Sequence, residues 1–305
     1  MTALLTVTDL SLSPVLEEVS FTVERGEVVC VVGPPGNGAT ALIECLAGGT
    51  EPDAGHIEML GATVGPGDRR PAGMAAALRG ERLPDRMRIG DAVRLFSRLY
   101  GTRGLSGRLI DLLDLEPLMP KRFGGLTDGQ RRRAMIGLAL VGNPELTLLD
   151  EPTAGLREGS RNRIEATIDE LRAGYGGVCV LLDDLAQAER LADRVVLLRE
   201  GRILAEGAPS RLIGLLGSVH VLSVPPHLRV DRLSEVRVLP CAAATYLYGP
   251  RPALEAAVQE LAPMSGDRVW SIRRPTLRDA YLTLSAVPDP PEPDPFGSEP
   301  AALEA

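Results

Sequence analysis

The most regular feature of this chain is a set of short, continuously apolar runs separated by longer segments of mixed polarity. Runs without alternation predict strands buried on both faces, as in a parallel sheet covered by helices. The expected strands are Val28–Val32, Leu146–Leu149, Val178–Leu182 and Val195–Leu198. The intervening segments carry apolar residues at helical spacing, and the expected helices are Thr40–Leu46, Asp128–Leu140 and Arg161–Arg172. Alternation of strand and helix predicts an α/β core.

Two regions depart from this alternation. The segment from Leu83 to Arg122 has helical spacing and no strand pattern, which indicates a helical insertion in the core. After Gly217 the pattern predicts a small α+β appendage with strands Val219–Val224, Thr245–Tyr248 and Arg268–Ile272 and a helix Pro252–Leu261. The expected domains are residues 1–216 (helical subdomain about 83–140) and 217–285, followed by a disordered acidic, proline-rich tail, 286–305.

Composition narrows the possible functions. The net charge of −8 argues against binding driven by nucleic-acid phosphates. No apolar run is long enough to cross a bilayer, and no secretory signal is visible, so we expect any membrane role to come through a partner. The four cysteines lack metal or redox spacing and are expected to be buried free thiols in a reducing compartment.

The first candidate site is the turn that follows the strand Val28–Val32. It runs Gly33-Pro34-Pro35-Gly36-Asn37-Gly38-Ala39-Thr40 and leads into a helical pattern. A phosphate-binding loop needs glycines for close backbone approach, a lysine for phosphate charge and a Ser or Thr for Mg²⁺. Gly33 and Gly38 have this spacing and Thr40 suits the metal, but Ala39 stands at the lysine position.

Two further segments carry candidate chemistry. The buried strand ending at residue 149 is followed by Asp150, which suits a Mg²⁺ ligand, and Glu151, which suits a base for an attacking water. Thr127 and Gln130 have the spacing of a capping box at a helix start. The arginines of 131–133 that follow are expected to form a solvated helix face.

Taken together, GPPGNGAT, LTDGQRRR, LLDEPTAGL and AERLADRVVLLREGRILAEG, in this order over residues 4–210, resemble the ATP-binding subunits of ABC transporters. RRPTLRDAYLTLSA resembles the C-terminal end of the drug-exporter type, whose membrane partner is a separate chain. The resemblance implies a P-loop ABC ATPase fold, ATP and Mg²⁺ as cofactors, a permease partner, and a cytoplasmic position on the inner face of the membrane. It places the nucleotide on residues 33–41, ending with Ala41, and the metal on Thr40 and Asp150.

The chain departs from the family pattern at several positions around the phosphates. By the resemblance, Arg79 stands at the lid-loop Gln position, Asp183 at the switch-His position and Arg157 at the Asp that signals across the dimer. The signature, which acts on the nucleotide of the opposite subunit, is Leu126-Thr127-Asp128-Gly129-Gln130. The adenine-stacking aromatic, expected between Leu10 and Leu16, is missing.

These losses predict weak ATP binding and impaired hydrolysis, since each lost charged contact to phosphate removes roughly 1.5–3 kcal/mol. Glu151 remains either as a base or as part of the turn, and Asp128 both favours its helix and repels phosphate. Arg79 and Asp183 either pair and close the site or lie solvated. We expect a heterodimer with an active homologue rather than a homodimer. Alternatives are a slow working ATPase, or a non-catalytic regulatory or scaffold protein of this fold.

Overall fold

The computed structural model describes residues 3–65, 68–226, 228, 235–265 and 270–286. The chain divides into two compact units, Met1–Ser218 with Arg274–Ala280, and Val219–Arg273 with Tyr281–Ala305. Of the expected disordered tail, 286–305, all but Ala286 lies outside the described residues.

The first unit is built on a six-stranded sheet in the order β10-β9-β3-β8-β7-β6. Strands β6, β7, β8, β3 and β9 are parallel to their neighbours, and β10 joins β9 in antiparallel fashion. The strands are β3 (Val28–Val32), β6 (Met74–Ala77), β7 (Leu146–Asp150), β8 (Gly177–Leu182), β9 (Arg194–Arg199) and β10 (Arg202–Gly207). All residues of β3, β7 and β8 are buried, so the four predicted core strands are confirmed.

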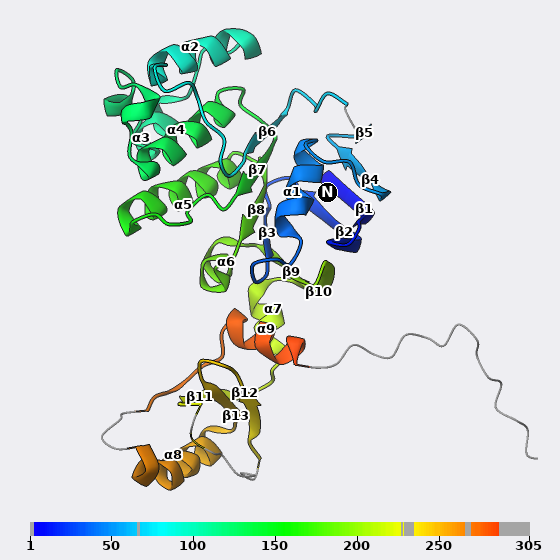
Figure 1. Cartoon of the computed structure of the whole chain (residues 1–305), viewed down its shortest axis with the longest axis vertical. Helices are drawn as coiled ribbons and strands as arrows, with labels where there is room; N and C mark the ends of the chain where they lie inside the picture. Colours follow the sequence, from blue (N-terminus) through cyan, green and yellow to red (C-terminus); the bar gives the residue numbers. More distant parts are fainter. Residues whose placement is uncertain (1–2, 66–67, 227, 229–234, 266–269, 287–305) are drawn as a thin grey trace, which may run out of the picture. The chain divides into compact units, whose positions relative to one another are not determined.

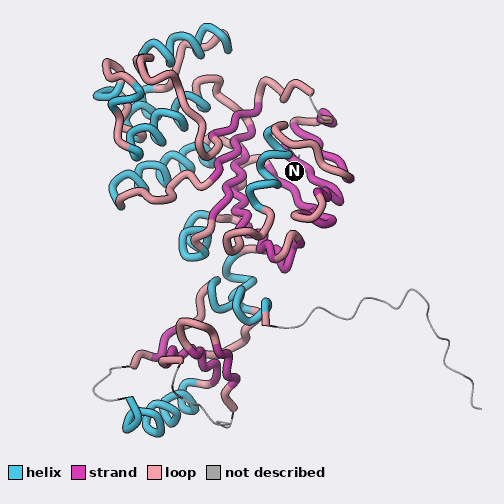
Figure 2. Tube along the Cα trace, in the orientation of Figure 1, coloured by secondary structure: helices cyan, strands magenta, loops and turns pink. Residues whose placement is uncertain are grey.

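Helices cover both faces of this sheet, as the continuous apolar runs require. Figure 1 shows α1 on one face and α2, α3, α4 and α5 together on the other, and the tube in Figure 2 shows the strands between these layers. The helices of this unit are α1 (Ala39–Ala47), α2 (Ile89–Tyr100), α3 (Gly107–Leu112), α4 (Asp128–Leu140), α5 (Glu158–Ala173), α6 (Leu185–Leu191) and α7 (Pro209–Gly214). The predicted α/β core and its helical insertion are therefore confirmed.

The chain also forms a second sheet that the search for continuous apolar runs missed. It is antiparallel in the order β2-β1-β4-β5, with β1 (Ala3–Leu12), β2 (Leu16–Glu24), β4 (Ala54–Met59) and β5 (Ala62–Val64). Its strands bury one face only, which gives an alternating pattern instead of a continuous run. The buried side chains of this sheet, of α1 and of the parallel strands form one apolar cluster, so α1 is held between the two sheets.

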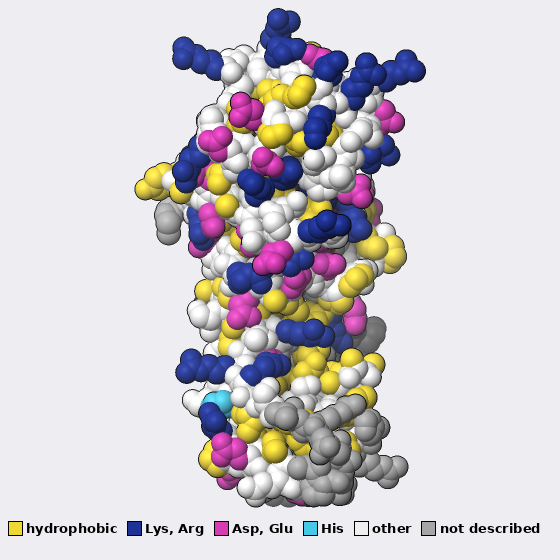
Figure 3. Space-filling view, turned by 90° about the vertical axis from the view of Figure 1, so that its left-hand side faces the viewer, with side chains coloured by type: hydrophobic (Ala, Val, Ile, Leu, Met, Phe, Trp, Pro, Cys, Tyr) yellow, Lys and Arg dark blue, Asp and Glu magenta, His cyan; other side chains and the backbone are white. Residues whose placement is uncertain are grey.

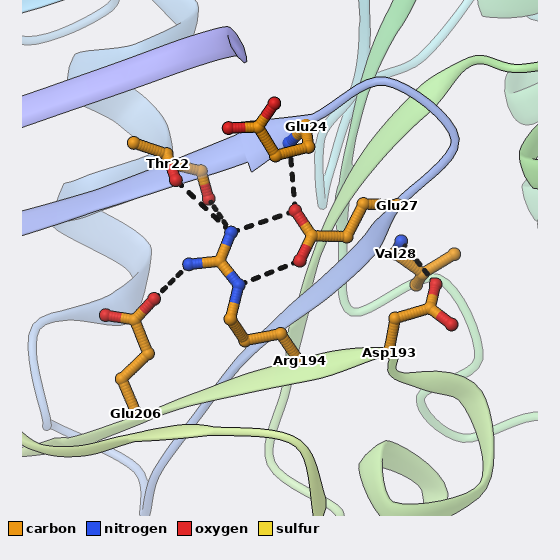
Figure 4. Close-up of polar contacts among 7 residues, drawn as sticks. All are labelled: Thr22, Glu24, Glu27, Val28, Asp193, Arg194 and Glu206. Atoms are coloured by element: carbon orange, nitrogen blue, oxygen red, sulfur yellow. Dashed lines mark hydrogen bonds and ion pairs between the residues drawn. The ribbon is translucent and has the colours of Figure 1, made fainter. Parts of the chain in front are cut away.

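An ion-pair network joins these two sheets at the start of β3 (Figure 4). The guanidinium of Arg194 donates to both carboxylate oxygens of Glu27 at 2.8 Å, to the Thr22 carbonyl at 2.8 Å, and pairs with Glu206. The bidentate bond to Glu27 raises the pKa of Arg194. Burial opposes ionisation of Glu27, but the bonds from Arg194 outweigh it and hold the pKa of Glu27 below its usual value. The network fixes β9 and β10 against β2 through charges that water screens little.

The second unit is a four-stranded antiparallel sheet in the order β12-β13-β11-β14, packed against α8. Its elements are β11 (His220–Val224), β12 (Arg237–Pro240), β13 (Thr245–Gly249), α8 (Arg251–Ser265) and β14 (Ile272–Arg273), and α9 (Leu277–Ser285) follows. The sequence missed β12, and the expected strand Arg268–Ile272 starts outside the described residues and continues as β14. The expectation of buried thiols holds for Cys30, Cys45 and Cys179 but is wrong for Cys241, which is partly exposed in a surface turn.

Candidate functional site

The predicted site residues are brought together by the parallel sheet. Residue 33 follows β3, Glu151 follows β7, Asp183 follows β8 and Arg79 lies two residues after β6. In register, Val32 pairs with Leu182, Asp150 with Leu181 and Ala77 with Leu149, so these strands end at one edge. Ligands of open α/β sheets bind in the crevice at this carboxyl edge.

The predicted phosphate loop, residues 33–40, runs from the end of β3 into the start of α1. Gly38 has φ 94°, and a Cβ there would lie 2.4 Å from the carbonyl oxygen of Val15, in the turn between β1 and β2. Only glycine tolerates both this backbone and this approach. The Gly201 N–H, between β9 and β10, donates to the Asn37 carbonyl at 3.1 Å, so two turns support the loop.

Two carboxylates lie at the end of β7. Asp150 is buried, and its Oδ2 accepts the Arg79 backbone N–H at 3.0 Å. Glu151 follows in a left-handed conformation, φ 46°, and its N–H donates to the Leu181 carbonyl at 3.1 Å. A non-glycine residue at positive φ is uncommon and is found where surrounding structure enforces it. The turn therefore sets the direction of the Glu151 side chain.

Burial, together with the nearby charges of Asp183 and Asp150, raises the pKa of Glu151 from 4.5 to about 7. Arg79 and a hydrogen bond from the Asp183 backbone act in the opposite direction but are weaker. Burial, and after it the charge of Asp183, which was expected at the switch-His position, thus disfavour ionisation of the carboxyl expected to serve as the base. Near pH 7, about half of the Glu151 side chains would be protonated and unable to accept a proton from water.

The pairing of Arg79 with Asp183 considered above is not present in this structure. Both residues are exposed, and the ion pairs among the described residues do not include one between them. Both residues act on Glu151: the charge of Asp183 raises the pKa of Glu151, and the charge of Arg79 lowers it. Of the two alternatives, two solvated charges are the one that fits.

The expected solvated arginine face of α4 is wrong for two of its three residues. Arg132 donates to the carbonyls of Leu78 at 3.2 Å, Asp150 at 2.8 Å and Glu151 at 2.7 Å. Arg133 is buried and pairs with Asp114 at 2.7 Å. Consecutive helical residues point about 100° apart, so three arginines in a row cannot share one face. That spacing was the signal in the sequence that would have found Arg132. Its bonds join α4 to the turn at Asp150 and Glu151, here called the carboxylate turn.

The predicted signature segment forms the start of α4. The Gln130 N–H donates to Thr127 Oγ1 at 3.4 Å and the Thr127 N–H to Gln130 Oε1 at 3.1 Å, which confirms the capping box. The Asp128 side chain is 94% exposed and lies 3.6 Å from Arg131. Its carboxylate is therefore presented to solvent at the positive end of the helix.

The remaining predicted positions lie on loops around the same edge. Arg157 is the N-cap of α5, and its side chain makes no capping hydrogen bond. Sequence reasoning missed Asp184, whose carboxylate caps α6 by accepting the N–H groups of Ala186 and Gln187. The signal was an Asp directly before a helical pattern. Behind it, Thr153 donates to Gln187 at 2.7 Å, which ties the carboxylate turn to α6.

The residues present fit a nucleotide only in part. The backbone loop and helix start can bind phosphate, and Asp150 with Thr40 offers one carboxylate and one hydroxyl to Mg²⁺, which takes its other ligands from phosphates and water. Arg79, exposed two residues after β6, can offer a side-chain cation at this edge. Val15, in the segment that lacks the expected aromatic, lies against the loop at Gly38. No described helix is long and apolar enough to span a membrane.

Comparison with known proteins gives three kinds of match. The sequence profile described as ABC transporter matches residues 16–154. The Nod factor export ATP-binding protein I of Rhizobium sp. (strain N33) is 34% identical over 284 residues, which cover 89% of this chain and 92% of the relative. The protein of the same name from Burkholderia lata is 33% identical over 206 residues, covering 65% and 67%.

Solved structures agree with the sequence matches. An ATP-binding subunit of an ABC transporter has a TM-score of 0.62 and 28% identity, covering 70% of this chain and 93% of its own. A nucleotide-free ATP-binding cassette from an ABC transporter has a TM-score of 0.58 and 22% identity, covering 68% and 92%, and shows likeness of fold alone.

Proposed function

Since this chain belongs to the ABC transporter family as an ATP-binding subunit, we propose that it serves an exporter, coupling ATP binding to transport through a separate membrane permease. The relatives named for Nod factor export, which match along most of this chain, support the direction of transport. We further propose that it lies in the cytoplasm against the inner face of the membrane, held there by the permease.

We propose that its own ATP site is degenerate and turns over ATP slowly or not at all. The observation that carries this is the combination of Ala39 in the phosphate loop with the burial and neighbouring carboxylates that raise the pKa of Glu151 to about 7. Ala39 lacks the cation that would balance phosphate charge, and the raised pKa disfavours the charged form of Glu151 that would accept a proton. Thr40 and Asp150 would hold Mg²⁺, which would screen the phosphates, while Arg132 holds the carboxylate turn in place.

A groove of about 760 Å³ in the first unit supports the link to a permease. It is lined by side chains of α2 and α4 and by the segment before β6, among them Arg70, Phe96, Tyr100 and Met135. Leu99, also in the lining, is 68% exposed, and large exposed apolar side chains mark contact sites. We propose that a short cytoplasmic helix of the permease, with apolar side chains and an acid to meet the exposed Arg69 of the lining, binds here.

The face of the first unit drawn in Figure 3 lacks the charge pattern of a nucleic-acid-binding surface. In the upper part of Figure 3, arginine and lysine side chains are interspersed with acidic ones and form no single basic stripe. A nucleic-acid-binding surface needs such a stripe. We propose a second ABC ATP-binding subunit as the dimer partner, with a functional phosphate loop facing the Asp128 helix start and supplying most of the hydrolysis.

The test is purification of the tagged chain from native membranes, with identification of co-purifying chains and measurement of Mg²⁺-ATP turnover. We expect a permease and a second ATP-binding chain, and turnover that Glu151→Gln in this chain changes little. Ala39→Lys should tighten ATP binding about tenfold to a hundredfold, whereas Pro35→Lys, which adds the same charge elsewhere on the loop, should not. If the isolated chain hydrolyses ATP and Glu151→Gln abolishes that activity, the slow ATPase is favoured instead. If no membrane chain co-purifies, the scaffold role is favoured.

A further inference from the structure

The interior of the phosphate loop is filled by one of its own side chains. Asn37 is only 6% exposed, and its Oδ1 accepts the backbone N–H of Ala39 at 2.9 Å. At the other end of the carboxamide, Nδ2 lies against Gly33, where a Cβ would be 2.0 Å from it. The carboxamide therefore lies between the first glycine of the loop and the first amide of α1.

That amide is one of the groups an anion would need. The first N–H groups of a helix have no intrahelical acceptor, and at the end of a glycine-rich loop they face the bound phosphate. In α1 the first intrahelical bond runs from the Leu42 N–H to the Gly38 carbonyl, so the Ala39 N–H needs an acceptor from elsewhere. Asn37 Oδ1 supplies it, in the manner of a phosphate oxygen.

The backbone of Asn37 is held by two hydrogen bonds, whereas its side chain is held by one. The Asn37 N–H donates to the Pro34 carbonyl at 3.2 Å, and the Asn37 carbonyl accepts the Gly201 N–H at 3.1 Å. Nδ2 has no hydrogen-bond partner among the described residues, although it is buried. A buried donor without a partner is unfavourable. Packing and the single bond through Oδ1 are thus what keep the carboxamide in the loop.

We infer that the Asn37 carboxamide is an intramolecular competitor for the phosphate group, which a nucleotide must displace from the Ala39 N–H before the loop can bind it. This inference rests on the proposed nucleotide-binding function and adds a residue that lowers affinity independently of the missing lysine. Loss of the carboxamide frees a donor for a charge-assisted bond to phosphate, which is stronger than the neutral bond it replaces.

The test is titration calorimetry of the full chain with Mg²⁺-ATP and, separately, with inorganic pyrophosphate. Asn37→Ala and Asn37→Ser should each bind both ligands about tenfold more tightly than the parent. The same gain should appear when each is combined with Ala39→Lys. Asn162→Ala, which removes an exposed asparagine of α5, is the matched control and should bind as the parent does. In the ligand-free Asn37→Ala protein, hydrogen exchange of the Ala39 amide should be faster than in the parent.

The outcomes separate this inference from the proposed function. If Ala39→Lys gains affinity while Asn37→Ala and Asn37→Ser do not, with Ala39 exchange unchanged, the competitor role is refuted and nucleotide binding stands. If no variant binds either ligand, including Ala39→Lys, both ideas are refuted. Should Asn37→Ala fail to fold by circular dichroism, Asn37→Ser carries the test, because its short hydroxyl can donate to a phosphate oxygen.

Discussion

Replacing Glu151 by Gln should stabilise the protein increasingly as the pH rises above 4.5, with the full gain reached near pH 7. The carboxyl has a pKa of about 7 in the folded chain against 4.5 for the unperturbed side chain, so between these values the folded state binds more protons than the unfolded one. Stability contributed by the protonated group is therefore complete below pH 4.5 and is lost as pH rises through 7. A Gln side chain does not ionise, so the variant does not lose this stability as the pH rises.

The size of the effect follows from the surroundings of Glu151. The difference between 4.5 and about 7 corresponds to roughly 3 kcal/mol for a fully buried group. Glu151 is only partly buried, and solvent screening reduces the expected gain to ~1–2 kcal/mol at pH 8. Glu and Gln have nearly the same shape and would occupy the same left-handed backbone conformation. Any backbone strain at this position therefore cancels when the two proteins are compared.

The assay is urea unfolding of the parent and Glu151→Gln at a series of pH values from about 4.5 to about 8, a range that spans both pKa values of the carboxyl. The difference in unfolding free energy should be near zero at the acid end and grow towards the alkaline end. Asp183→Asn should lower the pKa of Glu151 and also stabilise the protein at the alkaline end. The double variant Asp183→Asn with Glu151→Gln should gain less unfolding free energy than the sum of the two single variants. A difference that does not change with pH, or a parent that gains stability relative to the variant as pH rises, would refute this account of the acidic site.

Three stability predictions follow from other contacts, each measured by urea unfolding. Arg194→Met should cost about 3–5 kcal/mol, because it leaves partly buried carboxylates without a partner, whereas Arg202→Met, which breaks an exposed pair, should cost under about 1 kcal/mol. Arg132→Gln should cost about 2–3 kcal/mol through lost bonds to three carbonyls, whereas Arg131→Gln should cost much less. Thr127→Ala should cost about 1 kcal/mol through the lost cap. Equal losses for the two members of either arginine pair would contradict the role given to burial.

What the sequence determined by itself is local. The buried strands, the helices between them and the capping box of α4 depend on the spacing of residues within one segment, and each was found where predicted. The gathering of the site at one sheet edge also follows from the sequence, since parallel strands end on the same side. The second sheet was missed because its strands alternate, being buried on one face only.

What only the tertiary structure decided is where polar groups from distant segments meet. Arg132 was expected in solvent and instead binds carbonyls up to 54 positions away. The raised pKa of Glu151 depends on its burial and on Asp183, which the fold brings in from the next strand. The position of Asn37 under Gly33 depends on the path of the loop, which two neighbouring turns hold. Hydrogen bonds and charges act over a few ångströms, so their partners are fixed by the folded chain and not by spacing along it.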